Sequence, residues 1–94
     1  MTTADRQAFT HALRTLAEVF RAKISPSTIS VYFRALEEFD LEYVRRAMRE
    51  AVVQHEWLPK PMELRRTIES GLERDYQRKV QAWNAAKRAE KGDD

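Results

Sequence analysis

Apolar residues recur every three to four positions along most of the 94-residue chain, and this spacing constrains the fold more than any other feature. The first such stretch runs from about Ala4 to Ala22, where Phe9, Leu13, Leu16 and Phe20 mark one face. Spacings of three and four place these side chains on a single stripe of an α-helix. Sustained alternation typical of strands does not occur, so the sequence predicts an all-α fold.

Three more helices are predicted, each with its own start signal. The second runs from Pro26 to about Glu38 after the N-cap candidate Ser25, and the third from Leu41 to about His55 after Asp40. The string Trp-Leu-Pro-Lys-Pro at residues 57–61 must stop the third helix, because proline fixes φ and restricts the preceding residue. Its second proline can open the fourth helix. Expected buried residues of these three helices are Ile29, Tyr32, Phe33, Leu36, Leu41, Val44, Met48, Ala51, Val52, Met62, Leu64, Ile68 and Leu72.

The fourth helix changes character after Leu72, because the residues beyond that point are mostly charged or polar. We therefore expect a small four-helix bundle-like domain over residues 1–72. Residues 73–94 are predicted to form a helical extension that projects from this domain. The last residues, from Lys91 onward, are expected to be disordered.

The composition excludes several classes of site. With no cysteine, the chain has no disulfide, no cysteine-ligated zinc and no thiol nucleophile, and its two glycines cannot build a phosphate-binding loop. His11 and His55 have no catalytic partner at a suggestive spacing, apart from the chain neighbour Glu56 of His55. The acidic cluster within residues 37–42 fits a solvated turn better than a Mg²⁺ or Ca²⁺ site. We therefore predict no enzyme activity, no metal and no cofactor.

The chain also lacks signals for a membrane or for secretion. No apolar run approaches the roughly 18–20 residues that a membrane-spanning helix needs. The N-terminal string MTTADRQAF lacks the charged and then apolar pattern of a signal peptide. We therefore expect a cytoplasmic protein.

The segment Ser25–Ser30 resembles the opening of the recognition helix of a helix-turn-helix DNA-binding protein. In that motif the turn usually carries a glycine where this chain has Arg21, and Ser25 comes about two residues late. Tyr32 and Phe33 would have to read bases, although both are expected in the core. Because of the resemblance in its opening residues, a small DNA-binding protein is kept as an alternative to the leading hypothesis given below.

Arginines of the third and fourth helices form a candidate basic patch. They are Arg45, Arg46, Arg49, Arg65 and Arg66. Such a patch could contact phosphate or an acidic protein surface. The competing interpretation is an ordinary solvated face with intrahelical ion pairs, such as Glu42–Arg46, Glu42–Arg45 and Arg65–Glu69.

The C-terminal extension combines aromatic anchors with basic residues, which is typical of a helix that binds a groove on a partner protein. The candidate partner-binding residues are Arg74, Tyr76, Arg78, Lys79, Val80 and Trp83. Alternatively the helix folds back, so that Tyr76, Val80 and Trp83 complete the bundle. In a third interpretation it joins two copies of the chain into a homodimer.

Several short strings combine between Leu13 and Ile68. They are Leu16, Tyr32-Phe-Arg-Ala-Leu36, Glu38-Phe-Asp-Leu-Glu-Tyr-Val44, Ala47, Ala51, Val52 and Trp57-Leu-Pro-Lys-Pro-Met-Glu-Leu-Arg65. This combination resembles the bacteriophage helicase loader/inhibitor family, and residues 58–65 are its most distinctive part. The resemblance implies a small all-helical N-terminal domain followed by a flexible C-terminal segment.

The same resemblance implies a role in DNA replication. Members of that family bind the replicative hexameric helicase, restrain its ATPase and deliver the ring to the origin-bound replication protein, and the C-terminal part engages the helicase. Carried over to this chain, the contact residues lie after Leu72, among the candidates named above. The leading hypothesis is a phage or prophage protein that loads or inhibits the helicase. The alternatives are a small DNA-binding protein and a homodimeric helical structural protein.

Overall fold

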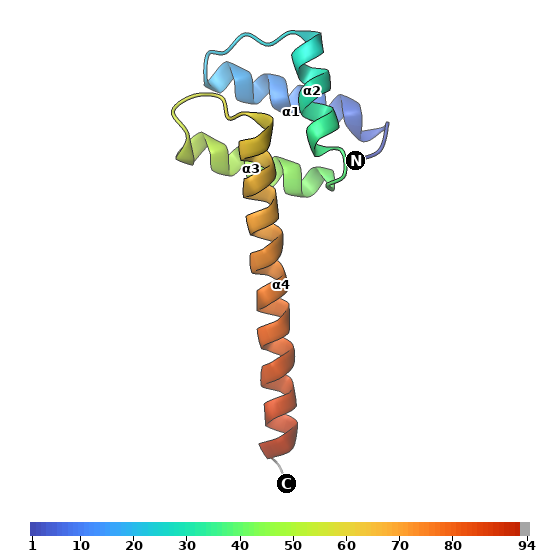
Figure 1. The fold of residues 1–94 in the computed structure, drawn as a ribbon, viewed down its shortest axis with the longest axis vertical. Helices are drawn as coiled ribbons and strands as arrows, with labels where there is room; N and C mark the ends of the chain where they lie inside the picture. The colour runs from blue at the N-terminus through green and yellow to red at the C-terminus, as the bar shows by residue number, and fades with distance from the viewer. Residues whose placement is uncertain (93–94) are drawn as a thin grey trace.

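Four α-helices make up the fold of residues 1–92, which are the residues that this computed structural model describes (Figure 1). They are α1 (Asp5–Val19), α2 (Pro26–Leu36), α3 (Leu41–Gln54) and α4 (Pro61–Gly92), and no strand occurs in this range. The predicted all-α class is confirmed. α4 continues through Lys91 and Gly92 in place of the disordered end expected from the sequence, and the rest of that expectation concerns Asp93 and Asp94, which lie outside the described residues.

The helix starts show which N-cap signals operate. Ser25 is extended and its Oγ accepts a hydrogen bond from the Thr28 amide at 3.2 Å, as its sequence context predicts. Before α1, Thr2 and Asp5 bond reciprocally, since each side chain accepts from the other's amide. The bond from the Thr2 amide lowers the pKa of the Asp5 carboxyl. Asp40 has the extended backbone of an N-cap, but its side chain caps nothing.

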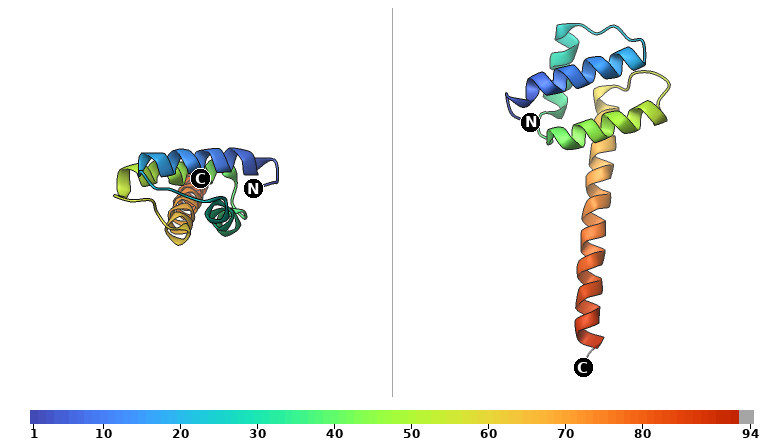
Figure 2. Two further views of the ribbon diagram at one scale, coloured as in Figure 1. Left: turned by 90° about the horizontal axis from the view of Figure 1, so that it is seen from above. Right: turned by 180° about the vertical axis from the view of Figure 1, so that it is seen from behind.

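The four helices pack as a ring in which each packs mainly on two others. α1 packs on α2 and α3, and α4 packs on the same two helices. α1 and α3 lie side by side and run in the same direction, while α2 and the first turns of α4 cross them on one side (Figures 1 and 2). The bundle is therefore a two-layer arrangement with one core.

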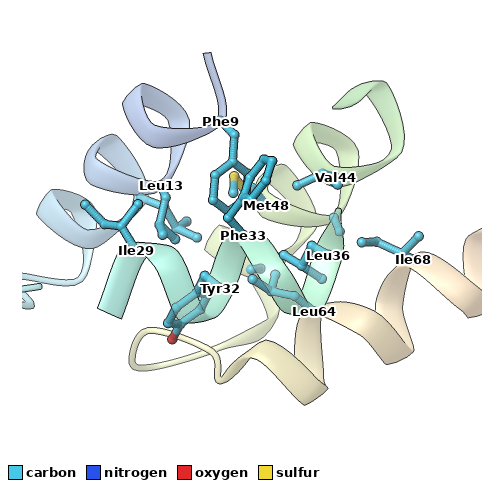
Figure 3. Close-up of a cluster of buried hydrophobic side chains, with 13 residues drawn as sticks. Phe9, Leu13, Ile29, Tyr32, Phe33, Leu36, Val44, Met48, Leu64 and Ile68 are labelled. Atoms are coloured by element: carbon cyan, nitrogen blue, oxygen red, sulfur yellow. The ribbon is translucent and has the colours of Figure 1, made fainter. Parts of the chain in front are cut away.

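All four helices contribute to this core (Figure 3). Phe9 and Phe33 meet edge to face with their ring centroids 5.4 Å apart. Two predicted core residues, Val52 and Met62, are instead 46% and 57% exposed. Val52 lies on the α3 face that borders a groove beside α1, and Met62 lies in the first turn of α4. The fully or nearly buried core residues are Phe9, Leu13, Leu16, Ala17, Ile29, Tyr32, Phe33, Leu36, Val44, Ala47, Met48, Ala51, Leu64 and Ile68.

The proline-rich connection between α3 and α4 is anchored to α2. The Tyr32 hydroxyl donates a buried hydrogen bond to the Pro59 carbonyl at 2.7 Å, and Pro59 itself is buried. Burial raises the pKa of the Tyr32 phenol. Glu63 accepts a hydrogen bond from the Lys60 amide at 3.2 Å and thereby caps the start of α4.

Arg65 ties the start of α4 to the turn between α2 and α3. Its guanidinium donates to the Ala35 carbonyl at 2.6 Å, pairs with Glu38 and lies 5.0 Å from the centre of the Phe39 ring. Arg65 also pairs with Glu69 at 3.3 Å, which confirms that predicted intrahelical pair. Residues 58–65, the most distinctive part of the family resemblance, therefore hold the start of α4 against α2 and the turn that follows α2.

α4 is much longer than the bundle is wide, and the molecule measures 63 × 30 × 17 Å (Figure 1). Its radius of gyration is 17.5 Å, against about 12 Å for a compact chain of this length. The helix passes through Gly71 and Leu72 without a break. Gly71 is buried there, and the nearest side-chain atom to its missing Cβ belongs to Arg74, at 3.8 Å.

Candidate partner-binding surface on α4

α4 leaves the other helices a few turns after Leu72. The last part of α4 that lies beside another helix is next to Tyr43 of α3. Tyr43 lines a shallow depression there together with Asp75, Arg78, Lys79 and Ala82 of α4. Within residues 1–89, no hydrogen bond or ion pair joins residues 76–89 to the bundle. The alternative in which the helix folds back onto the bundle is therefore wrong (Figure 2).

Two aromatic side chains stand in solvent on this projecting part. Tyr76 is 64% exposed and Trp83 is 59% exposed, while Val80 between them is half-buried. Spacings of four and three put the three residues on one helical face. The Lys87 ammonium lies 4.2 Å from the Trp83 ring centre on the same face. The surface thus presents aromatic anchors beside a cation.

The projecting part is also the basic part of the protein. Residues 1–75 contain 12 basic and 12 acidic residues and are neutral overall. Residues 76–89 carry Arg78, Lys79, Lys87 and Arg88 and no acidic residue. The excess positive charge is therefore concentrated where the aromatic anchors lie, so this surface favours an anionic partner.

Arg74 differs from the other partner-binding candidates because it faces the bundle. Its guanidinium lies 3.6 Å from Glu50 of α3. The neighbouring Asp75 pairs with Arg46 at 3.2 Å. These two contacts hold the middle of α4 against α3, and the remaining candidates lie beyond them.

The five arginines of the candidate basic patch occupy separate places. Arg46 pairs with Glu50 and Asp75 rather than with Glu42, and Arg65 faces the turn after α2. Arg66 is exposed beside Gln54 and Ser70, on the side of α4 toward the end of α3. Arg45 and Arg49 line the groove between α1 and α3. The structure therefore brings Arg45 and Arg49 together but does not gather all five into one patch.

The helix-turn-helix alternative loses the side chains that would read bases. Ser25–Ser30 form the cap and first turn of α2, and Ile29 is buried. Tyr32 and Phe33 are each only 7% exposed. Neither ring can reach a base without leaving the core.

The two histidines lie apart. The Nδ1 atom of His55 is 3.3 Å from a Glu63 carboxylate oxygen, and His11 is exposed on α1. In the part of the chain that the structure describes, no three His, Asp or Glu side chains lie close enough together to hold a metal ion. None of the described helices has the length and hydropathy of a membrane span.

The groove between α1 and α3 was not predictable from the helical pattern alone. Val19 and Val52 lie together at one end of it, where they continue the apolar stripes of their helices but remain exposed. Comparisons of this chain with protein-family models, with curated proteins and with solved structures find no match.

Proposed function

We propose that this protein is a non-enzymatic phage or prophage replication protein that binds the replicative hexameric DNA helicase of the bacterial host through residues 76–89 of α4. The observation that carries the binding role is the exposure of Tyr76 and Trp83 on a basic helix that extends away from a neutral bundle. Exposed aromatic residues cost little conformational entropy to immobilise and dominate many interfaces. The choice of the helicase as the partner rests on the sequence resemblance. A protein that binds this helicase acts in the bacterial cytoplasm.

The proposal can be tested with fluorescence, because the chain has two tryptophans, Trp57 and Trp83. The variant Trp57→Phe leaves Trp83 as the only indole. Adding the host helicase, with ATP or with ADP, should shift the emission of Trp83 to the blue as the ring leaves water. An unchanged spectrum with both nucleotides, at helicase concentrations up to tens of micromolar, would contradict the proposal.

A matched pair of variants locates the contact. Tyr76→Ala combined with Trp83→Ala should weaken helicase binding by roughly a thousandfold, since hot-spot aromatics contribute about 2 kcal/mol or more each. Trp57→Ala is the control, because Trp57 is 69% exposed but lies in the connection before α4. Equal loss in both variants would show that α4 is not the specific contact.

The four cations of residues 76–89 favour nucleic acid as a second candidate partner. Titration with duplex and single-stranded DNA distinguishes a nucleic-acid partner from the helicase. Binding to DNA alone, with affinity that falls steeply as salt increases, would replace the helicase proposal with a DNA-binding function.

A further inference from the structure

A second surface, distinct from α4, lies in the groove between α1 and α3. Its floor is apolar and consists of Ala12, Leu16 and Val19 from α1 with Met48 and Val52 from α3. Val19 is 56% exposed and Val52 is 46% exposed, although both continue the buried stripes of their helices. Together with this floor, the two valines form one continuous apolar surface beside the two arginines of α3.

The shape of the groove follows from the direction of its two walls. α1 and α3 lie side by side and run the same way, so the floor residues advance together along both helices (Figure 2). From Ala12 to Val19 the groove extends over two helical turns, or about 10 Å. A third helix of two to three turns would fit between the walls, with apolar residues spaced i, i+3, i+4 and i+7.

One wall of the groove is basic. Arg45 and Arg49 lie four residues apart on α3, and no carboxylate lines the groove. Among the described side chains, neither arginine forms an ion pair within 4 Å, whereas Arg46, on the adjacent face of α3, pairs with Glu50 and Asp75. Arg45 lies close enough to Asp5, beyond the groove end, to contribute to lowering the pKa of that carboxyl.

We propose that this groove binds an amphipathic helix of a partner protein whose edge carries acidic residues facing Arg45 and Arg49. The charges argue against the far half of α4 from a second copy as the occupant, because residues 76–89 carry four cations and no acid and would face a basic wall. An acidic helix buries Val19 and Val52 and pairs both arginines. This proposal stands apart from the function of α4, so each can fail without the other.

Two synthetic peptides of 14 residues test the proposal on the full chain. Both carry leucines at i, i+3, i+4 and i+7, and the flanking positions are glutamate in one and lysine in the other. The amide signals of the isotope-labelled protein should shift on adding the glutamate peptide, with the largest changes along residues 12–19 and 45–52. The lysine peptide should bind roughly tenfold more weakly or worse, because its charges oppose the two arginines.

Charge reversal on the protein should exchange these preferences. The double variant Arg45→Glu and Arg49→Glu is expected to prefer the lysine peptide, whereas the control Arg34→Glu, which alters an exposed arginine of α2, keeps the original preference. If the double variant does not fold, Val52→Asp at the exposed groove end gives the second test, and it should abolish binding of the glutamate peptide. Equal binding of both peptides to the native protein, or shifts confined to α4, would overturn the proposal.

Discussion

Arg21 is the only non-glycine residue of residues 1–92 with a positive φ, at 54°. It ends α1 in a Schellman arrangement, since the Ala22 amide bonds the Ala17 carbonyl at 2.8 Å and the Arg21 amide bonds the Glu18 carbonyl at 3.0 Å. This position normally carries glycine, because a Cβ is strained in the left-handed region. In the sequence, arginine at position 21 argued against a helix-turn-helix, because that motif usually has glycine there. The backbone of Arg21 nevertheless adopts the left-handed conformation that glycine favours.

Replacing Arg21 by glycine should stabilise the protein. Relief of the strained backbone exceeds the extra entropy that glycine gives the unfolded chain, so we expect a gain of about 0.5–1 kcal/mol in the free energy of unfolding. Urea denaturation followed by circular dichroism measures it. Lys23→Gly in the same connection is the control and should not stabilise, because φ is not positive there. Equal gains from both variants would refute the strain at Arg21.

Tyr32 gives a second prediction, in which stability depends on pH. Tyr32→Phe leaves the Pro59 carbonyl without its buried donor, at a cost of about 1–2 kcal/mol near neutral pH. Burial raises the folded-state pKa of Tyr32, so its contribution is complete below the unfolded pKa of about 10 and is lost as pH rises through the folded value. The stability difference between native protein and variant should therefore narrow above pH 10.

Denaturant titrations at pH 8 and near pH 11 measure this narrowing. Tyr76→Phe is the control, because the exposed Tyr76 ring donates no hydrogen bond within residues 1–89. It should change the free energy of unfolding by less than about 0.5 kcal/mol at pH 8. A constant difference between native protein and Tyr32→Phe across the pH range would contradict the role of burial.

At the scale of the elements, the sequence predicts most of what holds the bundle together. The spacing of Phe9, Leu13 and Leu16, and the Ser25–Pro26 start, are local signals that survive in the structure. Contacts between distant residues have no such local signal. The bond from Tyr32 to Pro59 joins residues 27 apart, and the groove walls come from α1 and α3. Exposure of Val52 likewise follows from how two helices meet and not from the stripe on one of them.

α4 should show a gradient of stability along its length. Its first turns pack on α2 and α3, whereas its far part extends away from both (Figure 1). A helix without tertiary contacts is marginal in water, so its end should open far more often than its start. Amide hydrogen exchange should be slow around Leu64 and Ile68 and faster by orders of magnitude around Trp83. Uniform protection along α4 would show that the far half is packed, for example in a dimer.

The whole molecule has an elongated shape that scattering can measure. Small-angle X-ray scattering of the monomer should give a radius of gyration near the 17.5 Å of the structure, whereas a collapsed chain would give about 12 Å. The value should not depend on protein concentration if α4 is free in solution. A rise with concentration, together with a doubled mass in light scattering, would favour the homodimer.

The continuity of α4 through Gly71 and Leu72 also fixes how the bundle is oriented when the far end is held. Each residue of an α-helix advances about 1.5 Å and turns about 100° around the axis. Adding one alanine after Asp75 would therefore swing the bundle by more than a quarter turn around an anchored Trp83. Adding seven residues would nearly restore its heading while displacing it by about 10 Å. The length of α4 between the bundle and Trp83 therefore sets both the distance of the bundle from a bound partner and its rotation about the helix axis.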